Sequence, residues 1–200
     1  MLLYELDYTH NLNRQRKKLF FLFMSIMIEL GYRRRLKKLQ KLLKKIKQPS
    51  VVLVETGSER FKAGTHDYYA QSSNFRYLSG SELRPAVILI SNSNSLPVLL
   101  AKKPDPNYSI WNGKLETPSD LAKSLNIDLK YVSGESFLNE LLSSIKKHQR
   151  LYLDSSDGLE SKTLLSYLNS LNASERNSYP NQIFSVDDLL APLRLYKDAQ

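Results

Sequence analysis

The sequence predicts an α/β domain in which a mixed β-sheet is flanked by helices on both faces. Apolar runs of strand length alternate with segments of helical periodicity, which is the pattern of α/β folds. A polar turn at residues 92–95 joins two apolar runs and predicts an antiparallel pair within the sheet. The 200 residues are 42% hydrophobic, which is sufficient for one substantial core.

The first strand is expected directly after a helix break. Pro49 and Ser50 end a helical segment, and the β-branched run 51–55 that follows has the length of a strand. Further strands are expected at 75–78, 86–90, 97–101, 129–132 and 151–154. Helices are expected at 117–125, 135–147 and 158–171. Thr117 gives the clearest start signal, because a capping residue is followed by Pro118 in the first turn.

An amphipathic helix precedes the first strand. Between residues 29 and 47, apolar side chains recur three and four positions apart, with lysines between them. Such a helix can lie on an anionic membrane, follow a phosphate backbone or pack on its own domain, and the last is the commonest arrangement. We therefore expect Leu36, Leu39 and Leu43 to pack against the sheet.

The net charge of +9 is concentrated at the amino end of the chain. Residues 1–48 contain 13 Lys and Arg against 3 Asp and Glu, whereas residues 49–200 contain 16 against 17. The body of the domain is therefore close to neutral, and no nucleic-acid partner is expected from its overall charge.

Residues 1–27 are interpreted as a poorly specified basic and apolar extension. The apolar run 19–28 is shorter than the roughly 20 residues that span a bilayer. It follows a basic cluster, as in a signal peptide, but no small-residue cleavage site comes after it. We expect no membrane span, and Met24 or Met27 is an alternative start. The absence of cysteine suits a cytoplasmic protein and excludes thiol chemistry.

The sequence contains no recognisable catalytic constellation. The three histidines, His10, His66 and His148, are isolated from other metal-ligating residues, and no zinc, phosphate-loop or serine-hydrolase motif is present. Four aspartates either gather around a divalent ion or, more commonly, form caps and turns; they are Asp154, Asp157, Asp187 and Asp188. No catalytic or metal-binding residue is therefore assigned.

Residues 65–80 carry a distinctive run of aromatic and amide side chains that ends at Gly80. Its form is Tyr-x-x-Gln-x-Ser-x-Phe-x-Tyr-x-x-Gly, read with either Tyr68 or Tyr69 at the start and followed by Pro85 and an apolar strand. This segment resembles the central motif of aminopeptidase P and its prolidase relatives. Two positions depart from that family, because Ala70 and Gly64 stand where many members have Arg and Asp.

Three further segments resemble the same family in its order and spacing. They are Asp105 followed by Trp111 in 110–113, the strand 151–154, and the segment 186–198, which resembles the linker into the catalytic domain. The resemblance covers residues 28–200. It implies the creatinase amino-terminal fold, which is ribonuclease H-like, over residues 28–190, with residues 191–200 starting a linker.

The resemblance also implies where catalysis takes place. In the family, a carboxy-terminal pita-bread domain holds two divalent metals, usually manganese, through two Asp, one His and two Glu. These metals activate water to cleave the bond before proline and release the amino-terminal residue. The chain as given lacks these ligands, so by itself it is expected to be inert.

The implied role of the amino-terminal domain is substrate gating and formation of dimers or tetramers, with proline-containing peptides as substrates. Trp111, with Tyr69, is the gating candidate, because the matching Trp of the family reaches the active site of a neighbouring subunit. The alternative for Trp111 is a core position. The alternative for the whole chain is a stand-alone protein-binding module of the same fold, as in histone-chaperone subunits.

Overall fold

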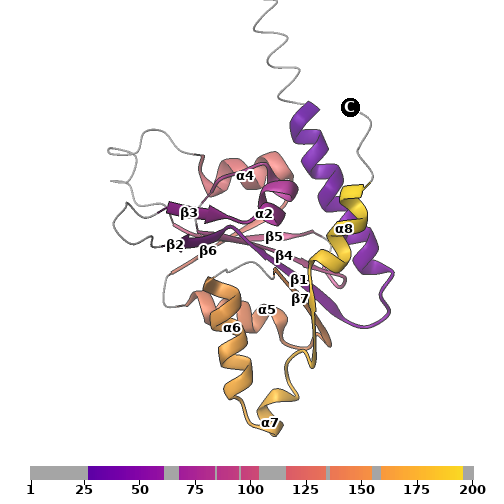
Figure 1. The fold of residues 1–200 in the computed structure, drawn as a ribbon, viewed down its shortest axis with the longest axis vertical. Coiled ribbons are helices and arrows are strands. Elements are labelled where there is room, and N and C mark those ends of the chain that lie inside the picture. Colours follow the sequence, from indigo (N-terminus) through magenta and orange to yellow (C-terminus); the bar gives the residue numbers. More distant parts are fainter. Residues whose placement is uncertain are drawn as a thin grey trace, which may run out of the picture.

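The computed structural model describes residues 27–60, 68–83, 85–94, 96–103, 116–133, 136–154 and 159–195. A central sheet lies between two layers of helices (Figure 1). The sequence predictions for an α/β domain with helices on both faces are therefore confirmed.

Six strands form the main sheet in the order β6-β5-β4-β1-β7-β8. Their bounds are β1 Ser50–Glu55, β4 Ala86–Ser91, β5 Val98–Lys102, β6 Asp128–Val132, β7 Arg150–Leu153 and β8 Gln182–Ser185. Strand β1 pairs antiparallel with β4 and parallel with β7, and β4 pairs antiparallel with β5. The remaining pairs, β5 with β6 and β7 with β8, are parallel. The sheet is mixed, as the turn after β4 predicted.

A two-stranded sheet extends from the end of β1. Strands β2 (Gly57–Arg60) and β3 (Tyr68–Gln71) pair antiparallel, with Gly57 opposite Gln71. The sequence did not predict this ribbon or strand β8. Strand β3 itself forms the first part of the segment that resembles the family motif.

Alternate residues of each central strand enter two separate cores. Val52 and Val54 of β1 belong to one buried cluster, and Val51 and Leu53 belong to the other. We call the first side, covered by helix 27–44, α2 (Ser73–Ser79), α4 (Pro118–Leu125) and α8 (Asp187–Leu195), the first face. The second face is covered by α5 (Phe137–Ile145) and α6 (Leu159–Ser170), and the short α7 (Ala173–Arg176) follows α6 (Figure 1).

Helix 27–44 packs against the first face, as its leucine spacing predicted. The side chains of Leu36, Leu39 and Leu43 are at most 2% exposed. Arg33 donates from Nη2 to the carbonyl of Lys123 at 3.3 Å and from Nε to that of Ser124. These bonds engage carbonyls in the last turn of α4, where the Lys123 carbonyl also accepts from the Asn126 backbone amide at 3.2 Å. The two helices are therefore joined by polar as well as apolar contacts.

The prediction of a strand at 75–78 is wrong, because this segment is helix α2. Ser72 caps the helix by accepting a hydrogen bond from the Phe75 backbone amide at 3.2 Å. Gly80 ends it in the left-handed conformation with φ 68°. Phe75, Leu78 and Ser79 are buried at helical spacing, so tertiary packing overrides the strand preference of the aromatic residues.

The expected helix starting after Thr117 is confirmed with its full capping geometry. Thr117 and Asp120 form reciprocal bonds, and Pro118 occupies the first turn. At the other end of the chain, α8 continues through residue 190 to Leu195. The proposed boundary between domain and linker at residue 190 therefore stays a prediction.

Candidate functional site

The motif helix α2 lies over a polar cluster at the carboxyl end of β7, which is buried at Asn74 and Asp154 and exposed at Arg194. Asn74 donates from Nδ2 to Asp154 Oδ1 at 3.0 Å and to Asp187 Oδ1 at 3.2 Å. Ser72 Oγ donates to the other oxygen of Asp154, and Arg194 of α8 donates to Asn74 Oδ1. Asn74 and Asp154 are each 3% exposed. We call these five residues the Asn74 cluster.

The Asn74 cluster joins parts of the chain that are far apart in sequence. A single amide bonds two carboxylates through its nitrogen and one guanidinium through its oxygen. Hydrogen bonds that involve charged groups are stronger than neutral ones, and burial strengthens them further. The cluster therefore fixes α2 against β7 and α8. Of the four aspartates considered as metal ligands, Asp154 and Asp187 come together here.

Two arginines enclose Tyr77 on the outer side of α2. The Arg35 guanidinium lies 4.6 Å from the ring centroid and donates to the Tyr77 carbonyl at 2.9 Å. The Arg194 guanidinium lies 5.1 Å from the same centroid, and the Tyr77 hydroxyl donates to the Leu193 carbonyl at 3.3 Å. Cation–π contacts and backbone bonds therefore connect helix 27–44, α2 and α8 through one motif residue.

The beginning and the end of the motif have structural roles. Gln71 donates from Nε2 to the Ser81 carbonyl at 2.6 Å, and Ser81 Oγ donates to Glu116. A Cβ atom on Gly80 would lie 2.3 Å from the ring of Tyr32, so a side chain there would clash as well as strain the backbone. The motif thus specifies close packing of α2 on helix 27–44.

A second buried carboxylate lies on the second face. Glu55, which is 1% exposed, accepts hydrogen bonds from the backbone amides of Glu160 at 3.0 Å and Ser161 at 3.1 Å, in the first turn of α6. Burial raises the pKa of Glu55, and these hydrogen bonds partly oppose the rise. Glu55 serves as the cap of α6 through its side chain.

The described residues contain one serine and histidine pair with catalytic spacing. His148 Nε2 lies 2.8 Å from Ser91 Oγ, and its Nδ1 lies 3.3 Å from the Ile145 carbonyl. Ser91 is 4% exposed, and it also bonds Ser93. Burial lowers the pKa of His148. Because Ser91 is shielded from solvent, a substrate carbonyl cannot reach it, and the pair fastens the turn after β4 to the segment before β7.

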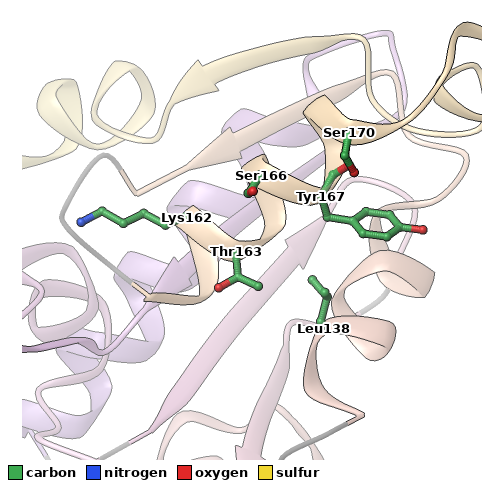
Figure 2. A pocket seen from close by; sticks show the side chains of 6 residues that line it. All are labelled: Leu138, Lys162, Thr163, Ser166, Tyr167 and Ser170. Carbon is green, nitrogen blue, oxygen red and sulfur yellow. The ribbon is translucent and has the colours of Figure 1, made fainter.

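A surface hollow of about 490 Å³ lies between α5 and α6 (Figure 2). Leu138 of α5 and five residues of α6 line it: Lys162, Thr163, Ser166, Tyr167 and Ser170. In Figure 2 the Lys162 side chain and the Tyr167 ring point in different directions. The lining lacks the convergent acid and base groups of an active site.

The structure describes only part of the residues predicted for substrate gating. Trp111 and Asp105 lie outside the described residues, as do His10, His66 and Asp157. Tyr69 lies in β3, opposite Glu59, and its side chain is outside the description. Within the described ranges, no group of three or more His, Cys, Asp or Glu converges in a way that could hold a metal ion. Both gating assignments stay predictions.

Three organising residues were not predicted from the sequence: Asn74, Ser72 and Arg35. Ser72 was detectable, because a serine followed after three positions by an apolar residue can start a helix. The partners of Asn74 were not, since they lie 80, 113 and 120 positions away along the chain.

Comparison with solved structures shows the same fold in three bacterial enzymes. Aminopeptidase PepP of Pseudomonas aeruginosa matches with a TM-score of 0.69 and 22% identity, over 86% of this chain and 39% of that chain. Aminopeptidase P of Escherichia coli, solved with the inhibitor Pro-Leu, matches at 0.67 and 20%, over 86% and 39%. Proline aminopeptidase P II of Yersinia pestis matches at 0.68 and 21%, over 86% and 40%. The chain thus spans about two fifths of the structures it matches.

A sequence search of curated proteins finds no match. The family model for the aminopeptidase P N-terminal domain matches residues 32–152, which is more than half of the chain and includes the whole motif from Tyr68 or Tyr69 to Gly80. The chain therefore belongs to the aminopeptidase P N-terminal domain family.

Proposed function

We propose that this chain is the amino-terminal substrate-gating and oligomerisation domain of a Xaa-Pro aminopeptidase. The family match over residues 32–152 carries the proposal. In this proposal, a carboxy-terminal domain binds two divalent metals, with manganese as the expected ion, and releases the amino-terminal residue from Xaa-Pro peptides. In this proposal the metal ligands come from the carboxy-terminal domain, and the 200-residue chain is inert alone.

The packing of α8 supports the proposal that one domain gates the substrate entrance and another carries out catalysis. Arg194 bonds Asn74, and the Leu193 carbonyl accepts from Tyr77, so the last described helix is held to the family motif by two independent contacts. A catalytic domain that follows α8 would start from a fixed position on the first face. Such a fixed start allows one domain to wall the substrate entrance of another, because gating requires a defined relative placement.

The proposal is tested by comparing the 200-residue chain with the product of the complete gene. With manganese and the peptide Arg-Pro-Pro, the complete protein should release arginine, and the 200-residue chain should release none. Light scattering on the same samples measures their oligomeric state. Metal-dependent turnover by the chain after repurification would overturn the assignment of catalysis to a second domain. A stop codon after Gln200 would instead favour the protein-binding alternative.

Trp111 provides a residue-level test in the complete enzyme. If its indole closes a substrate cleft, Trp111→Ala should lower kcat/KM about ten- to hundredfold while leaving metal content and melting temperature nearly unchanged. Tyr131→Ala, which removes an exposed aromatic side chain from β6, is the matched control and should change neither quantity. A core Trp111 predicts the reverse pattern, a loss of about 3 to 5 kcal/mol in stability with normal activity of the folded fraction.

A further inference from the structure

Helix 27–44 carries a continuous basic stripe on its solvent side. Exposed basic residues recur there at three- and four-residue spacing: Arg34, Lys37, Lys38, Lys41 and Lys44, with Lys45 directly after the helix. The buried residues Leu36, Leu39 and Leu43 occupy the opposite side of the helix. Because neighbours at these spacings lie side by side, the stripe places like charges next to one another.

The stripe is separate from the contacts that hold the helix to the domain. Arg33 and Arg35, the half-buried arginines on either side of Arg34, bond the end of α4 and Tyr77. Within the described ranges, no ion pair involves Arg34, Lys37, Lys41, Lys44 or Lys45. Like charges at these spacings destabilise an isolated helix. No contact inside the domain therefore accounts for the clustered positive charge of the stripe. This charge points to an external anionic partner.

The amino end of the same helix is apolar and exposed. Met27, Ile28 and Leu30 are 48%, 52% and 39% exposed. Met27 and Leu30 continue the line of the basic stripe, whereas Ile28 continues the line of the buried leucines beyond the edge of the domain. Figure 1 shows this end of the helix projecting past the other described elements. We call these three residues the apolar tip.

We propose that the basic stripe and the apolar tip together dock the domain on a bilayer surface that contains anionic phospholipids. The stripe would contact the headgroup phosphates and carboxylates, and the apolar tip would enter the boundary between headgroups and acyl chains. The leucine face cannot enter the bilayer, because it is committed to the core. The contact is therefore peripheral. It agrees with the finding that no described helix has the length and apolar character to cross a membrane.

The apolar tip distinguishes a bilayer from a nucleic acid. A phosphate backbone would neutralise the stripe equally well, since lysines bind it without regard to sequence. It offers no apolar phase for Met27, Ile28 and Leu30, whose side chains would remain in water. Residues 49–200 are nearly neutral, so the stripe also gives the docked domain one preferred orientation.

The test is co-sedimentation of the purified 200-residue chain with vesicles. Binding is expected to vesicles of phosphatidylcholine mixed with phosphatidylserine, and little to phosphatidylcholine alone. Replacing Lys37, Lys41 and Lys44 by Gln should weaken binding at least about tenfold, because each cation near an anionic surface contributes appreciably. Replacing the same three by Arg, which keeps the charge, should restore it. Serine at all three positions of the apolar tip should also weaken binding.

The matched control removes the same charge elsewhere. Lys103, Lys123 and Lys146 are exposed outside helix 27–44, and their replacement by Gln should leave vesicle binding within about twofold of the unmodified chain. Circular dichroism checks that every variant is folded. Equal loss in the control, or equal binding to both vesicle types, would overturn the proposal. Tighter binding to a DNA or RNA duplex, insensitive to the apolar-tip substitutions, would replace it by nucleic-acid binding.

Discussion

Glu55 and Asp154 are the two buried carboxylates of the described residues, and they lie at the ends of neighbouring parallel strands. Asp154 is on the first face, where Ser72 and Asn74 donate to it from α2. Glu55 is on the second face, where it accepts hydrogen bonds from backbone amides in the first turn of α6. At the carboxyl ends of these two central strands, one carboxylate therefore lies within a side-chain network and the other lies at a helix end.

This difference separates two ways of attaching helices to a sheet. On the first face, side chains from helix 27–44, α2 and α8 converge on Asn74 and Tyr77, so the loss of one residue disturbs three elements. On the second face, α5 and α6 are held mainly by an apolar core, and Glu55 adds one polar attachment. The described part of the family motif from Ser72 to Gly80 lies on the first face, so these motif residues hold helices together as well as marking the family.

Asn74→Leu should have the largest effect on stability. Asn74 is hydrogen-bonded to three of the other four residues of its cluster, Asp154, Asp187 and Arg194. Leucine is similar in volume but leaves Asp154, Asp187 and Arg194 without their amide partner. We expect a loss of about 3 kcal/mol in the free energy of unfolding, measured by urea denaturation. Asn169→Leu, an exposed position on α6, is the control and should change stability by less than about 0.5 kcal/mol.

A small effect of Asn74→Leu on stability would contradict the conclusion that a side-chain network holds the helices of the first face. A double-mutant cycle of Asn74→Leu with Arg194→Gln tests the same conclusion more directly, since residues in one network show non-additive changes in stability whereas independent residues do not. Additive losses would mean that Asn74 and Arg194 stabilise the domain independently and do not act as one network.

The contrast between the faces also explains which features the sequence could predict. Helix 27–44 and α4 were predicted, because leucine spacing and the Thr117 cap are local signals. Helix α2 was mistaken for a strand, since Phe75 and Tyr77 alternate and aromatic residues favour strands. Its true state depends on burial against helix 27–44 and on Asp154, which is distant in sequence. The Asn74 cluster is wholly a tertiary property, so no local pattern contains it.

Glu55→Gln is expected to have the smallest effect, and it is visible mainly through pH. Burial raises the pKa of Glu55 above its ordinary value of 4.5, so the folded state holds the proton more tightly than the unfolded state does. The contribution of Glu55 to stability is therefore greatest at low pH, and it falls as the pH rises from about 4.5 through the raised folded value. Glutamine cannot ionise, so the variant should lack this fall.

The measurement is the difference in unfolding free energy between Glu55→Gln and the unmodified protein, followed by urea denaturation from pH 4 to pH 8. Glutamine loses one of the two bonds to α6, because its amide nitrogen cannot accept from a backbone amide. At low pH the variant should therefore be the less stable protein. As the pH rises, the difference should shift in favour of glutamine, because only the unmodified protein must then bury a charge. A difference in unfolding free energy that stays constant with pH would mean that the amides of α6 fully compensate the cost of burying the Glu55 charge. A difference that shifts in favour of the unmodified protein as the pH rises would mean that these amides stabilise the charged form of Glu55. Either result would mean that polar contacts attach the helices of the second face as strongly as those of the first face.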